Sequence, residues 1–128
     1  MKNIKKIGNE YEKKLLDFLK EKNYWVHLFS YNKDGQPCDV ICIKNNIAFL
    51  IDVKHCENDV FYFSRVESNQ YNCFLYASQC GNDYDNLGFA IYCEKTQDFR
   101  WLSFKMLLCF KSVGKVKVSC LKRLDEVL

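Results

Sequence analysis

The segment that most constrains the fold is residues 37–54, PCDVICIKNNIAFLIDVK. It contains two apolar runs separated by Asn45 and Asn46. Asparagine tolerates positive φ angles, which a two-residue hairpin turn of the favoured twist requires. The segment therefore predicts an antiparallel hairpin in which Asp39 on the first strand lies opposite Asp52 on the second.

This register brings charged groups together on one face of a sheet. Opposed residues of an antiparallel pair have Cβ atoms about 5 Å apart, so the carboxylates of Asp39 and Asp52 would repel each other. Lys54 points to the same face as Asp52, because residues two apart in a strand share a face. A hard divalent cation would offset the repulsion, so the segment predicts a metal site. The alternative is a strand end at which Asp52 and Lys54 reach solvent and pair with each other.

Composition fits one globular domain over residues 1–128, with 48% hydrophobic residues. The formal net charge of +3 does not by itself indicate nucleic-acid binding. No apolar run is long enough to span a membrane, and the first residues lack the apolar core of a secretory signal. We therefore expect a cytoplasmic protein without a membrane partner.

Eight cysteines are present, and none forms a Cys-x-x-Cys pair. Most lie within apolar runs, where a free thiol behaves as a small hydrophobic group. Buried reduced thiols are the favoured interpretation, in agreement with a cytoplasmic location, and disulfides or zinc ligation are the alternatives.

Two polar residues lie on apolar faces of predicted helices. Helical periodicity covers residues 4–22, and Glu12 borders its apolar stripe, so it is either a surface glutamate or a carboxylate with a partner in the core. A capping box of Ser64 and Glu67 predicts a second helix that continues to about Cys80. Gln70 lies on the apolar stripe of that helix, either as a core-edge amide or directed into the same site as the acids.

Further strands are expected over residues 25–31, 87–94 and 99–102, with a short helix over 103–110 and a final edge strand over 116–121. The element order, helix–three strands–helix–strands, predicts a mixed α/β fold with a central mixed sheet flanked by helices. His27 and His55 are expected to be isolated, with His55 in a loop.

The ordered set of these motifs resembles the PD-(D/E)-x-K nuclease superfamily. Gly8-Asn-Glu-Tyr-Glu12 is similar to the Gly-x-x-x-Glu of its Holliday-junction-resolvase branch, Pro37-Cys-Asp39 to the PD half, and Asp52-Val-Lys54 to the second half. Within the superfamily the chain looks most like the RecU-type resolvases of bacteria and phages, which also carry a Gln on the following helix, here Gln70. It lacks their long stalk, because only residues 32–36 separate the two strands that flank that position.

The resemblance implies a restriction-endonuclease-like core and a catalytic set of Glu12, Asp39, Asp52, Lys54 and Gln70. Mg²⁺, for which Mn²⁺ can substitute, would be held by Asp39, Asp52, Glu12 and the Val53 carbonyl. Lys54 would orient the attacking water or stabilise charge in the transition state, and Gln70 would position water or phosphate. Candidate DNA contacts are Lys2, Lys5, Lys6 and Lys33, although a lysine-rich terminus is more often a solvated end.

The leading function is therefore a metal-dependent, structure-specific DNA endonuclease that acts on branched DNA as a Holliday-junction resolvase. A homodimer is implied, because a four-way junction is cut on two strands of like symmetry. The alternatives are a restriction-type, flap or single-strand nuclease of the same fold, a non-catalytic protein that binds branched DNA, and a thiol-based metal or redox protein.

Overall fold

The computed structural model describes residues 4–29 and 38–128, with side chains from Glu10 onward. It contains three α-helices and eight strands within these residues, joined in places by short 3₁₀ turns. The helices are α1 (Ile4–Glu21), α2 (Ser68–Gln79) and α3 (Phe104–Cys109). The strands are β1 (Trp25–Leu28), β2 (Val40–Lys44), β3 (Ile47–Cys56), β4 (Val60–Tyr62), β5 (Leu87–Cys93), β6 (Asp98–Ser103), β7 (Lys115–Lys117) and β8 (Lys122–Arg123).

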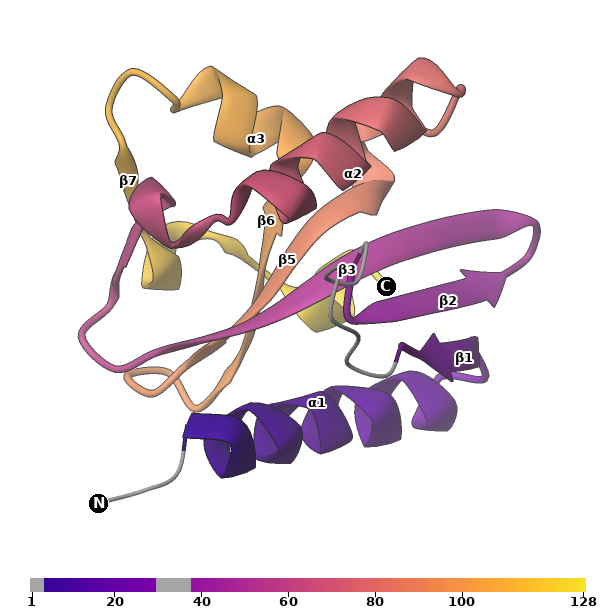
Figure 1. The fold of residues 1–128 in the computed structure, drawn as a ribbon. Coiled ribbons are helices and arrows are strands. Elements are labelled where there is room, and N and C mark those ends of the chain that lie inside the picture. The colour runs from indigo at the N-terminus through magenta and orange to yellow at the C-terminus, as the bar shows by residue number, and fades with distance from the viewer. Residues whose placement is uncertain (1–3, 30–37) are drawn as a thin grey trace.

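A six-stranded mixed sheet with the order β1-β2-β3-β5-β6-β8 forms the centre of the molecule. The β3–β5 pair is parallel and the other pairs are antiparallel. Helix α1 lies along one face of this sheet, and α2 and α3 lie on the other face (Figure 1). The predicted mixed α/β fold with a central mixed sheet flanked by helices is therefore confirmed.

The β2–β3 hairpin has the predicted register. Val40 pairs with Ile51 and Lys44 with Ile47, and the turn residues Asn45 and Asn46 have φ angles of 52° and 65°. Both angles are in the left-handed region that a two-residue turn of this hand requires. The regular ladder starts at Val40, one residue inside the predicted pair of Asp39 with Asp52. The Asp39 N–H still donates to the Ile51 carbonyl at 3.1 Å, so Asp39 remains beside β3.

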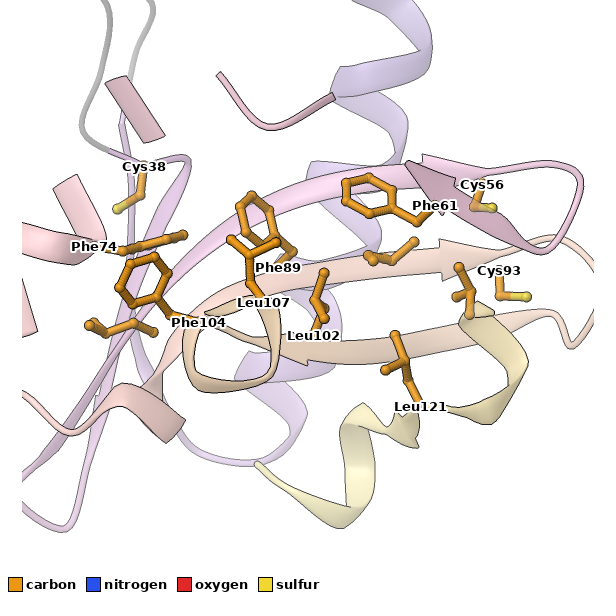
Figure 2. Close-up of a cluster of buried hydrophobic side chains, with 13 residues drawn as sticks. Cys38, Cys56, Phe61, Phe74, Phe89, Cys93, Leu102, Phe104, Leu107 and Leu121 are labelled. Carbon is orange, nitrogen blue, oxygen red and sulfur yellow. The ribbon is translucent and has the colours of Figure 1, made fainter. Parts of the chain in front are cut away.

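Two buried clusters fill the space between the sheet and the helices. Leu15 and Leu19 of α1 pack with Ile51 and Ala90 on one face. On the other face, Phe74 of α2 and the α3 side chains gather over β5 and β6 (Figure 2). Along β3, Ile51 and Val53 belong to the α1 cluster and Leu50 and Cys56 to the α2 cluster. Alternation along the strand therefore directs Asp52 and Lys54 to the α2 face.

Three sequence predictions are wrong in detail. Helix α2 begins at Ser68 rather than after Ser64, which lies in a 3₁₀ turn. Glu67 is the N-cap, and its capping box is formed with Gln70. The final edge strand predicted over residues 116–121 is divided between β7, which pairs with β4 in a separate two-stranded sheet, and a 3₁₀ turn, while β8 forms the edge of the main sheet.

The eight cysteines are free thiols, but they do not share one environment. Cys38, Cys42, Cys56 and Cys93 are buried, whereas Cys80, Cys109 and Cys120 are exposed. The prediction of buried thiols is therefore confirmed for four of the eight cysteines and is wrong for the three exposed ones. None of the helices in the described part of the chain is both long enough and apolar enough to cross a membrane.

Candidate active site

The carboxyls of Asp39 and Asp52 lie together beside the N-terminal end of β2. The Val53 N–H of β3 donates to Asp39 Oδ2 at 2.8 Å, which fixes that carboxylate against the strand that carries Asp52. The N–H and C=O groups of a strand residue point to the same neighbouring strand, so the Val53 carbonyl also faces Asp39. The two aspartate side chains therefore interact, although the regular ladder does not include the predicted pair of Asp39 with Asp52.

Asp52 is almost completely buried, with 2% of its surface exposed. Its Oδ2 lies 3.4 Å from Lys54 Nζ, but no described residue donates a hydrogen bond to this oxygen. Burial raises the pKa of Asp52 to about 9, and the hydrogen bond and negative charge of Asp39 add to the rise, while Lys54 opposes it. A buried carboxyl beside a second carboxyl, with one weakly paired oxygen, fits a site for a cation that would supply the missing positive charge.

Lys54 lies on the same face as Asp52, as predicted. Its Nζ contacts Asp52 and donates to the Arg65 carbonyl at 3.3 Å, in the segment that precedes α2. Arg65 in turn donates through Nη1 to the His55 carbonyl at 2.8 Å. These bonds hold the ammonium group beside the aspartate pair.

Glu12 belongs to α1, which packs on one face of the sheet, whereas the Asp52 side chain points to the face that α2 covers. Glu12 and Asp52 therefore lie on opposite sides of the sheet. The Glu12 side chain is partly buried, and burial, followed by the charge of Asp39, raises its pKa to about 7. The interaction is with Asp39 rather than Asp52. Within the described residues, no three His, Cys, Asp or Glu side chains lie close enough together to form a metal-binding group. Two aspartates are nevertheless enough for Mg²⁺, which keeps several waters and often uses one or two carboxylates.

Gln70 has a structural contact of its own. It is buried in the first turn of α2, where its Oε1 accepts the Glu67 N–H at 3.0 Å. This contact favours the interpretation of Gln70 as a core-edge amide, which here caps the helix. Of the predicted DNA contacts, Lys2 and Lys33 lie outside the described residues, as do the side chains of Lys5 and Lys6.

A neighbouring polar cluster was not predicted. His55 lies within β3 rather than in a loop, and its Nε2 is 2.7 Å from Glu94 Oε1. The Tyr11 hydroxyl donates to the same oxygen at 2.8 Å. The clue that the sequence offers to this cluster is adjacency, since Tyr11 precedes Glu12 and His55 follows Lys54. Nothing in the pattern links either residue to Glu94.

Comparisons with known proteins show the family and the fold of this chain. Residues 7–91 match a family model described as NERD, nuclease-related domain, and this range contains all five predicted catalytic residues. The structure is also similar to that of Hjc, a Holliday junction resolvase from the archaeal hyperthermophile Archaeoglobus fulgidus. The TM-score is 0.62 at 17% identity, over 77% of this chain and 78% of that chain. No curated protein sequence matches the chain.

At this identity the structural likeness shows the fold alone. It confirms the restriction-endonuclease-like core that the sequence predicted. The family match and the fold together support the predicted nuclease superfamily.

Proposed function

Because this chain belongs to the nuclease-related domain family, we propose that it is a metal-dependent DNA endonuclease that hydrolyses phosphodiesters in branched DNA, as a Holliday-junction resolvase does. The observation that carries the proposal is the buried Asp52 carboxyl, which lies beside Asp39 and has Lys54 as its cationic neighbour. The fold shared with a Holliday junction resolvase supports the choice of substrate.

The donor set suits Mg²⁺, which prefers oxygen ligands. Asp39, Asp52 and the Val53 carbonyl would hold the ion, with Glu12 contributing through a water molecule. When bound, Mg²⁺ supplies charge neutralisation at the phosphate and makes a water molecule more acidic. Mn²⁺, which also accepts oxygen ligands, is expected to substitute.

The chain's own groups would have distinct roles. The Val53 N–H keeps Asp39 turned toward β3. Lys54, at 3.4 Å from Asp52, would direct its ammonium protons to a phosphate oxygen or to the attacking water as negative charge develops. Gln70 would keep the start of α2 in place through its bond to Glu67, so that the segment bearing Arg65 continues to hold Lys54.

The RecU-type resemblance extends this proposal to a homodimer that cuts two strands of a junction. Because the stalk is missing, the junction contacts would come from the domain itself. We expect the protein in the cytoplasm, because free thiols such as these stay reduced there.

A cleavage assay on a panel of DNA structures tests the proposal. The purified protein is incubated with a four-way junction, a flap, single-stranded DNA and linear duplex, each with Mg²⁺ and with EDTA. We expect Mg²⁺-dependent cleavage with preference for the junction, and loss of cleavage in Asp52→Asn and Lys54→Ala. Preference for linear duplex or a flap would indicate another nuclease of the same fold. Junction binding without cleavage in Mg²⁺ or Mn²⁺ would indicate a non-catalytic protein.

A further inference from the structure

We propose that Tyr11, His55 and Glu94 form a latch that holds α1 against the sheet and thereby keeps Glu12 directed toward Asp39. These three are positioning residues, since none of them is expected to touch the metal or the DNA. The inference rests on the proposed function as a Mg²⁺-dependent nuclease, and it assigns a role to the polar cluster beside the candidate site.

One carboxylate oxygen joins three separate parts of the chain. Glu94 Oε1, directly after β5, accepts the Tyr11 hydroxyl of α1 at 2.8 Å and lies 2.7 Å from His55 Nε2 of β3. The Tyr11 and His55 rings also stack, with centroids 4.4 Å apart and planes 12° from parallel. Hydrogen bonds restrict distance and direction, and ring stacking restricts the tilt of the ring, so the position of Tyr11 relative to β3 is fixed in several directions.

Tyr92 of β5 makes further contacts with α1, on either side of Glu12. The Tyr11 ring lies 4.9 Å from the Tyr92 ring of β5, and Lys14 Nζ lies 4.6 Å from the Tyr92 centroid. Cation–π contacts of this kind are attractive at such distances. Tyr11 and Lys14 flank Glu12 in the sequence, so the rotation and the axial position of α1 at Glu12 are both constrained.

Positioning is needed here because Glu12 and Asp39 must both be ionised to act on a cation, and two carboxylates of like charge repel each other. Their repulsion, before a cation binds, favours a displacement of Glu12 toward solvent. The latch opposes this displacement. Because His55 directly follows Lys54, it also fixes α1 to the strand that carries Asp52 and Lys54.

The test measures Mg²⁺ binding to the full chain by isothermal titration calorimetry without DNA, together with unfolding in urea. Tyr11→Phe keeps the ring stack and removes the hydrogen bond. We expect it to weaken Mg²⁺ binding roughly 10-fold, the lower end of what loss of an orienting partner costs a metal site. Glu94→Leu should have the same effect, and Glu94→Gln, which retains an acceptor oxygen, should restore binding.

Tyr92→Phe is the matched control, because it keeps the ring that contacts Tyr11 and Lys14 and removes only a hydroxyl whose contact, with Gln97 Oε1, is long at 3.5 Å. It should bind Mg²⁺ as the unmodified chain does. A cycle with Glu12→Gln separates positioning from general support of the fold. If the latch acts through Glu12, Tyr11→Phe causes no further loss of affinity in the Glu12→Gln background.

Two outcomes would overturn the latch while leaving the nuclease proposal intact: unchanged Mg²⁺ affinity in Tyr11→Phe, or fully additive losses in the cycle. A chain that bound Mg²⁺ and responded to Tyr11→Phe, but cut no DNA, would support the latch and contradict the nuclease. A chain without any measurable Mg²⁺ binding would overturn both.

Discussion

The backbone N–H of Val53 donates a 2.8 Å hydrogen bond to Asp39 Oδ2, and this bond connects the two halves of the candidate site. It turns the carboxylate at the start of β2 toward β3, on which Asp52 and Lys54 share one face. The Asp39 charge is thereby held beside the buried carboxyl of Asp52. The two groups repel each other when both are ionised, and a bound cation would offset this repulsion.

The first prediction separates the charge of Asp39 from its hydrogen bond. Asp39→Asn can still accept the Val53 N–H through its amide oxygen but carries no charge. We expect Mg²⁺ binding to fall at least 10-fold while stability in urea stays close to that of the unmodified chain. Asp39→Ala should lose both. Equal destabilisation of the two variants would show that the charge, rather than the bond, supports the fold.

The second prediction concerns the pH dependence of stability in the metal-free protein. In the folded state the pKa of Asp52 is raised to about 9 and that of Glu12 to about 7, whereas both groups titrate near pH 4 in the unfolded chain. Between these values the folded state binds more protons, so the free energy of unfolding falls as pH rises from about 4 to about 9.

Urea unfolding at several pH values in EDTA measures this slope. Asp52→Asn, which has no proton to lose, should reduce the slope throughout this range and should nearly abolish it between about pH 7 and 9, where Glu12 is ionised in both states and Asp52 alone contributes. Addition of Mg²⁺ should restore stability most strongly at the high-pH end, because the ion binds the ionised carboxylates. A free energy of unfolding that rises with pH over this range would contradict the raised pKa of Asp52.

The third prediction distinguishes Lys54 from the metal ligands. Lys54→Met keeps much of the side-chain volume and removes the charge 3.4 Å from Asp52. We expect cleavage of a four-way junction to slow about 100-fold or more, since loss of one transition-state donor has that order of effect. Mg²⁺ affinity should be retained or increased, because a competing cation is removed. Loss of Mg²⁺ binding in this variant would place Lys54 in a structural role instead.

Local sequence signals predicted the parts of the fold that depend on neighbours in the chain. The turn at Asn45 and Asn46 determined the hairpin register, and with it the approach of Asp39 to Asp52. The boundary of α2 was missed, because Ser64 and Glu67 satisfy the same capping pattern as the pair that does form, Glu67 with Gln70.

Contacts between distant residues left no comparable signal. Tyr11 and Glu94 come together only when α1 packs on the sheet, so the periodicity of either segment does not predict their hydrogen bond. The same is true of β7, whose pairing with β4 joins residues that are separated in the chain by the whole of α2, β5, β6 and α3. Alternation along β3 also places Asp52 on the face of the sheet opposite α1, which agrees with the charge of Asp39, and not that of Asp52, raising the pKa of Glu12.

The fourth prediction tests the role of Gln70. Gln70→Ala removes the acceptor for the Glu67 N–H and should lower the free energy of unfolding by about 1 kcal/mol. Gln70→Glu retains a capping oxygen and should unfold at nearly the same urea concentration as the unmodified chain. If Gln70→Glu preserves stability and also preserves cleavage, the cap accounts for the residue. If stability is kept and cleavage is lost, the amide has a direct part in the chemistry.

The most direct test of the central claim, that Asp39 and Asp52 together bind a divalent cation, is anomalous diffraction from crystals soaked in Mn²⁺. The account predicts an anomalous peak within bonding distance of one oxygen of each aspartate and of the Val53 carbonyl, absent from crystals of Asp52→Asn. A soaked crystal with no peak between the two carboxylates, or with an unchanged peak in Asp52→Asn, would contradict it.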